Sequence, residues 1–222
     1  MSAGINYDVP FFSNTPDDTH CVQAALRMVL KYFLPERDFS WEELDKATAK
    51  VEGKWTWTMA GLVWMKGLGF MVKDIEDFDY AAFSRAGETY LLETFGEEVG
   101  REQIVHTGNL SQEMELARQF VESHLAEKRI PAVEEIIELL RQGYLVTCNV
   151  NARTLNSKEG YVGHFIVVKG VTDRSLIVHD PGLPALKNRD VDLALFERAW
   201  AYPNDTARNI VAFRLDKSGR PV

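Results

Sequence analysis

The clearest hydrophobic pattern in the chain is a helical stripe that follows residue 20. Apolar residues recur there at the i, i+3, i+4, i+7 spacing of one helical face: Val22, Ala25, Leu26, Val29 and Phe33. A turn-forming cluster at residues 16–19 precedes the stripe and offers an N-cap. The pattern therefore predicts a buried helix that begins between Thr19 and Cys21.

Shorter patterns of the same kind predict further helices up to residue 141. The expected helices cover residues 40–50, 58–68, 80–95, 111–127 and 132–141. Three of them begin at a serine or threonine, whose hydroxyl can cap the first turn. Residues 21–140 are thus expected to be mostly helical.

After Gly143 the pattern changes to short apolar runs rich in β-branched residues, which are typical of strands. The expected strands cover residues 144–150, 164–171, 175–180 and 209–215, and a helix is expected over 191–200. A short turn at 172–174 joins the second and third strands into a hairpin. Helices followed by a mostly antiparallel sheet form an α+β arrangement. We expect one domain over residues 1–222, with a mainly helical half (1–142) and a mainly β half (143–222).

Composition and charge exclude several classes of protein. The 222 residues are 45% apolar and 26% charged, which is typical of a folded globular domain and not of a disordered chain. The net charge of −8 argues against a nucleic-acid partner. No apolar run approaches the roughly 18–20 residues of a membrane span, and the first residues lack a secretory pattern. We therefore expect a cytoplasmic protein without a membrane partner, and the sequence does not indicate its oligomeric state.

The chain has two cysteines, Cys21 and Cys148, and no spacing of cysteine and histidine that is typical of a metal site. We expect both thiols to be reduced, and we expect neither a metal nor another cofactor. Cys21 opens the best-defined helix, where unpaired backbone N–H groups and the helix dipole stabilise a thiolate. A cysteine nucleophile needs this placement, although free cysteines are more often buried and inert. Cys148 lies within an apolar strand and is expected to be of that inert kind.

His164 and Asp180 lie at the two ends of the predicted hairpin. Their mean position, (164 + 180)/2 = 172, falls at the turn, so the two side chains are expected to face each other at the open end. A carboxylate that accepts from one ring nitrogen fixes the tautomer and leaves the other nitrogen free for chemistry. The alternative is a structural polar pair at the end of a hairpin.

Two segments carry a family resemblance. Residues 11–33, FFSNTPDDTHCVQAALRMVLKYF, resemble the nucleophile segment of papain-like cysteine peptidases, most closely the double-glycine, bacteriocin-processing peptidase-like domain. Residues 163–182, GHFIVVKGVTDRSLIVHDPG, are similar to that group's histidine strand, hairpin and Asp-Pro ending. The resemblance implies a papain-like fold in which Cys21 is the nucleophile, His164 the general base and acid, and Asp180 the residue that orients His164.

The resemblance also implies an oxyanion residue before the cysteine. The family has a glutamine there, and its nearest match is Asn14, seven positions before Cys21 and one methylene shorter. The family often has glycine directly after the cysteine, where this chain has Val22. These departures affect the part of the site that would hold the developing oxyanion.

Three functions remain open on the sequence. The first is a hydrolase that cleaves an amide or peptide bond through an acyl-enzyme on Cys21. The second is an acyltransferase, which passes the same acyl group to an amine or thiol, as in the similar acyltransferases of butirosin-type biosynthesis. The third is a non-catalytic binding module on a papain-like scaffold. The expected partner is a peptide or a small amide or acyl compound.

Other polar and aromatic residues have simpler interpretations. His20 adjoins Cys21 but points elsewhere on a helix, and we expect it at the surface or at the rim of a cleft. The aromatic group Trp55, Trp57 and Trp64 is expected in the core, with the wall of a substrate groove as the alternative. The acidic runs at 74–79 and 134–138 are expected to be solvated faces.

Overall fold

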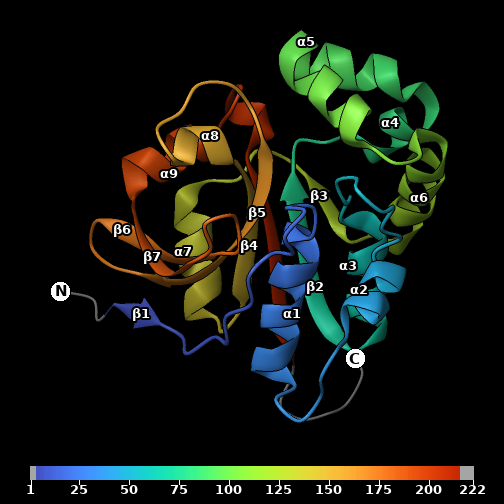
Figure 1. Cartoon of the computed structure of the whole chain (residues 1–222). Helices are drawn as coiled ribbons and strands as arrows, with labels where there is room; N and C mark the ends of the chain where they lie inside the picture. The colour runs from blue at the N-terminus through green and yellow to red at the C-terminus, as the bar shows by residue number, and fades with distance from the viewer. Residues whose placement is uncertain (1–3, 216–222) are drawn as a thin grey trace.

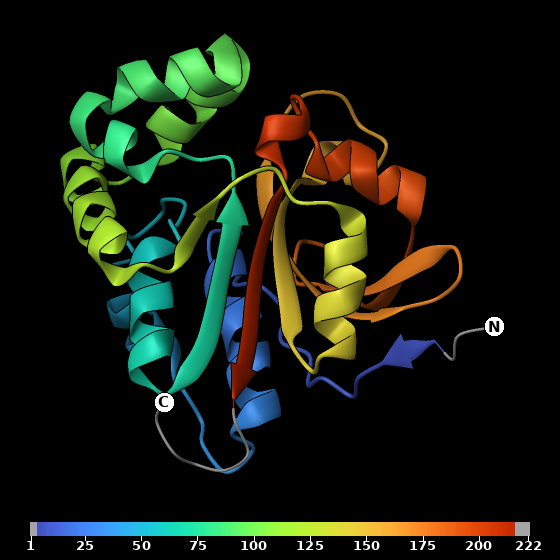
Figure 2. The same cartoon turned by 180° about the vertical axis from the view of Figure 1, so that it is seen from behind.

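The computed structural model describes residues 4–215 and combines one mixed sheet with helices on both of its faces (Figures 1 and 2). Within these residues the strand order is β3-β2-β8-β4-β5-β6-β7, with β1 beside β5. The strands are β1 (Ile5–Asn6), β2 (Phe70–Glu76), β3 (Ala126–Lys128), β4 (Leu145–Asn151), β5 (Gly163–Val171), β6 (Ser175–Asp180), β7 (Leu186–Asp192) and β8 (Asn209–Leu215). The helices are α1 (Cys21–Phe33), α2 (Trp41–Ala47), α3 (Met59–Gly67), α4 (Tyr80–Ala86), α5 (Glu88–His106), α6 (Leu110–Ser123), α7 (Val133–Arg141), α8 (Ala152–Leu155) and α9 (Leu193–Trp200), with a 3₁₀ turn at Asp205–Ala207.

The sheet is buried on both faces, which explains the continuous apolar runs of its strands. Along β8, Val211 and Phe213 pack in the cluster around α1, whereas Ile210 and Ala212 pack in the cluster around α7 and α9. Helix α1 is the most buried of the helices near the site, with Ala24, Ala25 and Met28 fully covered. Its N-terminal residue is therefore held rigidly against the sheet.

The expected α+β class is confirmed, but the mainly helical half also contributes strands to the sheet. Strand β2 pairs with β8 along its whole length, from Phe70 opposite Leu215 to Glu76 opposite Asn209, and β3 extends the sheet beyond it. The sequence FMVKDIE lacks a clean polar–apolar alternation, so its pattern alone does not identify a strand. The seven-residue pairing with β8, a contact distant in sequence, is what makes it one. Strand β7 has no clear pattern either, because six of its seven residues are at least partly exposed.

The helix expected over 80–95 is two helices. Gly87 ends α4 with φ 51°, a left-handed conformation that favours glycine. Helix α5 then runs much further than expected, to His106, and is kinked at Gly96, where φ is 76°. Helices α4 and α5 lie beyond the end of the sheet toward which β2 points (Figures 1 and 2). No helix within residues 4–215 is long and apolar enough to cross a membrane.

Candidate active site

Cys21 is the first residue of α1, and the loop before it is held by side-chain contacts. Asn14 Oδ1 accepts from the backbone N–H groups of Thr15 at 2.9 Å and His20 at 2.7 Å. No side chain caps α1 itself within the described residues. The first backbone N–H groups of the helix are thus left for another acceptor at the position of the sulfur.

His164 and Asp180 are joined by a hydrogen bond of 2.7 Å between Nε2 and Oδ1. Their positions in the sequence predicted that they lie directly opposite each other in the hairpin, but they do not. Val167 pairs with His179, which puts Asp180 nearer the turn than the residue opposite His164, and a bulge between Val168 and Gly170 shifts the register. The two side chains therefore meet along the diagonal, within reach as expected.

Asp180 is also anchored on its other side. Its Oδ2 accepts from Arg189 Nη1 at 2.8 Å, and its Oδ1 accepts from the backbone N–H of Gly182 at 3.0 Å. Although burial raises the pKa of Asp180, the contacts with His164, Gly182 and Arg189 outweigh that effect and lower it to about 2. The carboxyl group is therefore ionised at neutral pH and fixed in position.

Cys21 and His164 line the same cavity. Because Nε2 of His164 bonds to Asp180, Nδ1 is the ring nitrogen left to interact with the Cys21 sulfur. Burial favours the neutral imidazole, but the contacts with Asp180 and Cys21 outweigh it and raise the pKa of His164 to about 10. The structure thus brings Cys21, His164 and Asp180 together in one chain of contacts, which can hold a thiolate beside an imidazolium.

Asn14 lies on the loop before α1 and is buried. Its amide nitrogen donates to Asp18 Oδ1 at 2.8 Å, and its backbone N–H donates to Pro181 O at 2.8 Å. The second contact ties the cysteine loop to the segment just after Asp180. The side-chain donor that the resemblance assigns to an oxyanion is thus bonded to Asp18 in this structure.

Sequence reasoning missed two residues that support the site, Arg189 and Gly182. Arg189 is on β7, a strand without a clear pattern, so only the tertiary structure brings it to Asp180. Gly182 could have been found from the sequence, because it is the glycine of the run His-Asp-Pro-Gly that contains Asp180. A Cβ atom there would lie 3.1 Å from Asp180 Oδ1 and 3.2 Å from His164 Nε2, so a side chain at this position would crowd both groups and make one of them shift.

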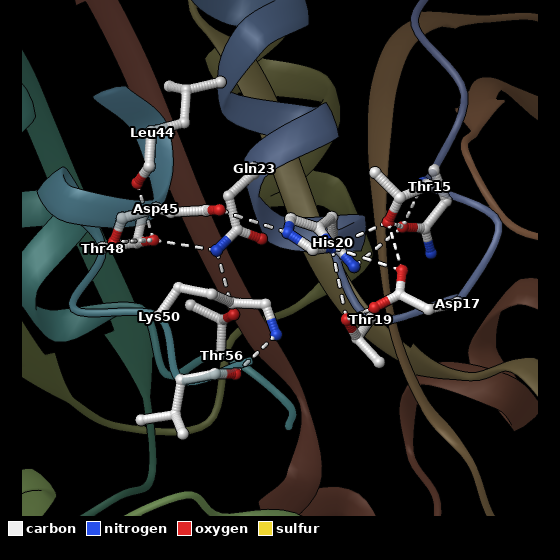
Figure 3. Close-up of polar contacts among 12 residues, drawn as sticks. Thr15, Asp17, Thr19, His20, Gln23, Leu44, Asp45, Thr48, Lys50 and Thr56 are labelled. Atoms are coloured by element: carbon white, nitrogen blue, oxygen red, sulfur yellow. Dashed lines mark hydrogen bonds and ion pairs between the residues drawn. The ribbon is translucent and has the colours of Figure 1, made fainter. Parts of the chain in front are cut away.

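His20 is partly buried and lies between its own loop and α2 (Figure 3). Its Nδ1 is 2.7 Å from Thr15 Oγ1, and its Nε2 is 3.3 Å from Asp45 Oδ1. Two residues after Cys21, Gln23 Nε2 donates to Thr48 Oγ1 at 2.8 Å and to Thr56 Oγ1 at 3.0 Å (Figure 3). These contacts fix the start of α1 and the loop after α2 relative to each other.

That loop supplies aromatic walls to the cavity. Trp55 and Trp57 both line it, whereas Trp64 packs against Phe39 in the core. Trp57 stacks on Phe83 with ring centroids 4.9 Å apart, so it is part of the core and of the cavity wall at once. Trp64 thus lies in the core, Trp55 lines the cavity, and Trp57 does both. Cys148 is fully buried as expected, and burial raises the pKa of its thiol.

The acidic run at 74–79 is not a solvated face, contrary to expectation. Asp74 is only 1% exposed, Glu76 is partly buried, and both line the cavity that contains Cys21. The pairing of β2 with β8 turns both side chains to the face of the sheet on which α1 packs, because Ile75 between them faces α7 and α9. A run of charged residues indicates a solvent-exposed surface only if the run does not pair as a strand inside a sheet.

A helix N-terminal cysteine beside a histidine that is oriented by a carboxylate is the arrangement of papain-like cysteine peptidases. A family model described as the Peptidase_C39-like family matches residues 6–207. The chain belongs to this family, and the resemblance to papain-like, double-glycine peptidase-like domains is confirmed. It is accordingly a protein of the cysteine peptidase type.

Two solved structures are similar to the chain. The peptidase domain of Streptococcus ComA, a bifunctional ABC transporter involved in a quorum-sensing pathway, is 14% identical with a TM-score of 0.49, over 93% of this chain and 98% of that one. A chain described as a C39-like peptidase from Bacillus anthracis is 15% identical with a TM-score of 0.49, over 97% of this chain and 99% of that one. No curated protein matches the chain.

Proposed function

We propose that the chain is a hydrolase that cleaves an amide or peptide bond through an acyl-enzyme on Cys21. The observation that carries this proposal is that Cys21 and His164 line one cavity, with His164 Nε2 hydrogen-bonded to Asp180 Oδ1 at 2.7 Å. Family membership supports the same class of reaction. The substrate is a peptide or a small amide, and the reaction requires neither a metal nor an organic cofactor.

In the first step the Cys21 thiolate attacks the substrate carbonyl, and the C–S bond forms as the carbonyl oxygen becomes an oxyanion. His164, as the imidazolium, gives its proton to the leaving amine when the C–N bond breaks. His164 then takes a proton from water, which attacks the thioester; the C–S bond breaks, the acid is released, and Cys21 is again a thiolate beside the imidazolium. Asp180 holds the imidazole in orientation and stabilises its charge throughout.

The oxyanion is bound in this proposal by the uncapped backbone N–H groups at the start of α1, with that of Cys21 foremost. Asn14 is the candidate for the second donor. For this role its amide has to exchange the 2.8 Å contact with Asp18 for one with the substrate. An Asn14→Ala variant would remove the amide donor and also the acceptor of the His20 backbone N–H. Asp18→Ala removes only the present partner of the amide donor, so it is the sharper test of that donor.

The test is digestion of a mixed peptide library, with products identified by mass spectrometry. We expect cleavage by the native chain and its loss in Cys21→Ala and His164→Ala, with Cys148→Ala as the matched control that retains it. Cleavage that survives Cys21→Ala would refute the assignment of the nucleophile. A library left uncut by the folded native chain would refute peptide hydrolysis and leave hydrolysis of a small amide, transfer to an amine, or simple binding.

A further inference from the structure

The cavity that contains Cys21 and His164 continues past them across the sheet toward β2. It has a volume of about 160 Å³, roughly ten times what one water molecule needs, so it is more than a packing defect. Asp74 and Glu76 of β2 line it as well, and we call these two residues the acid pair. Residues of α5, among them Phe95 and Gln103, line the cavity too. The catalytic chemistry proposed above uses only the Cys21 end.

The strand order sets the distance between the acid pair and His164. Strands β8 and β4 lie between β2 and β5, and neighbouring strands are about 4.8 Å apart. The acid pair is therefore about 14 Å across the sheet from the strand of His164, the length of roughly four extended residues. A substrate that reaches both ends of the cavity is an elongated molecule.

The acid pair shares one hydroxyl group. Tyr80 Oη is 3.0 Å from Asp74 Oδ2 and also contacts Glu76 Oε1. A phenol has one proton to donate, so it can serve only one carboxylate at a time. Burial, and repulsion by Glu76, raise the pKa of Asp74, and burial raises that of Glu76. The second carboxyl group thus needs either a proton of its own or a positive charge from outside.

Within residues 4–215 no cation pairs with Asp74 or Glu76. The nearest lysines in the sheet are used elsewhere, because Lys73 pairs with Glu127 at 3.6 Å and Lys128 pairs with Asp79 at 2.8 Å. The described lining of the cavity contains no lysine or arginine. An anionic ligand would therefore find no lysine or arginine in the described lining to pair with at this end of the cavity.

The other groups that line the cavity also favour a ligand group that is positively charged and donates hydrogen bonds. Oε1 of Gln103 is buried and has no hydrogen-bond partner among the described residues. Trp55, Trp57 and Tyr161 also line the cavity. One face of each ring is stacked on His106, Phe83 and Tyr202, respectively, so only the opposite face is left to attract a cation. An unused acceptor, buried carboxyl groups and aromatic rings that line one cavity are together the chemistry that recognises an alkylammonium or guanidinium group.

We propose that the acid pair binds a positively charged group of the substrate, an alkylammonium or a guanidinium, while the acyl carbon of that substrate is held at Cys21. This inference rests on the proposed function for its acyl end and adds the substrate class. Asp74 and Glu76 are specificity residues in it and do not touch the reacting atoms. Because the cation would neutralise the acid pair, its binding would replace the proton that the buried carboxyl groups otherwise retain.

The test uses alkylating probes that report on both ends of the cavity at once. N-substituted iodoacetamides carry a terminal ammonium on linkers graded up to about 14 Å, and matched probes carry a hydroxyl or a carboxylate instead. The rate of modification of Cys21 is measured by mass spectrometry relative to iodoacetamide. We expect the longer ammonium probes to react about tenfold faster than the hydroxyl probes, which corresponds to about 1.4 kcal/mol of binding. The carboxylate probes should be slowest.

The decisive variant is Asp74→Asn with Glu76→Gln, in which the ammonium preference should disappear. The matched control is Glu134→Gln with Glu138→Gln, which changes the net charge equally on exposed positions of α7 and should keep the preference. A preference that is absent in the native chain, or that survives the Asp74 and Glu76 changes, would overturn the inference. If the variant does not fold, protection of native Cys21 by decylamine, which is long enough to reach from the acid pair toward Cys21, but not by decanol would support the inference, and equal protection by both would overturn it.

The two proposals fail separately in this experiment. If plain iodoacetamide does not modify Cys21 faster than Cys148 in the folded chain, the nucleophile itself is wrong. If it does, and the charged probes show no preference, only the substrate class is wrong.

Discussion

Replacing Asp180 by asparagine tests how the carboxylate acts on the fold and on His164. The change keeps the shape of the side chain but removes the charge that accepts from His164 at 2.7 Å and from Arg189 at 2.8 Å. Two assays on this variant separate the effect of Asp180 on the free energy of unfolding from its effect on the ionisation of His164.

The effect on stability follows from the lowered pKa. The folded pKa of Asp180 is about 2 against an ordinary 3.8, and each pKa unit is worth 1.36 kcal/mol, so ionised Asp180 contributes about 2 kcal/mol. Because the folded pKa is depressed, this contribution is present above pH 4 and is lost as the pH falls through 2. Asp180→Asn should therefore lower the free energy of unfolding by about 2 kcal/mol at pH 7, with a smaller loss near pH 3.

The effect of Asp180→Asn on the candidate active site follows from the contact between Asp180 and His164. Without the carboxylate, burial of His164 is no longer outweighed by Asp180, so the pKa of His164 should fall from about 10. The imidazolium then persists over a narrower pH range, and alkylation of Cys21 by iodoacetamide near pH 7 should slow.

Urea denaturation from pH 3 to 8 and alkylation from pH 5 to 10 measure the two effects. Asp190→Asn, an exposed change on β7, is the matched control and should alter neither. The reasoning would be refuted by an Asp180→Asn variant with native stability at pH 7 and an unchanged alkylation profile.

Two further changes test other parts of the structure. Burial raises the pKa of Glu113 to about 7, so its ionisation destabilises the fold as the pH rises from about 4.5 through 7. Glu113→Gln should thus stabilise the chain by about 3 kcal/mol at pH 8 and hardly at pH 4, and equal effects at both values in urea denaturation would contradict this cause. Gly182→Ala places a Cβ atom 3.2 Å from His164 Nε2, so it should slow alkylation of Cys21 several-fold with little effect on the melting temperature, whereas a native alkylation rate would show that the backbone shifts freely.

Much of the fold could be predicted because the pattern is local. The stripe from Val22 to Phe33 identified α1, and strand β6 and strand β8 begin and end where the apolar runs do. Cys21 and His164 could be singled out because each stands at the start of such an element. Strand β2 could not, since a run with three charges becomes a strand only through its pairing with β8.

By itself the sequence determined the elements that bury an apolar face and the residue types at their ends, including the three groups of the candidate site. The tertiary structure decided which polar groups meet. It set the diagonal offset of His164 and Asp180 through a bulge, brought Arg189 to the carboxylate, and buried the acid pair in the cavity of the nucleophile. The physical reason is that hydrophobic periodicity is a local property of ten or twenty consecutive residues, whereas strand register and the burial of charged groups depend on partners far along the chain.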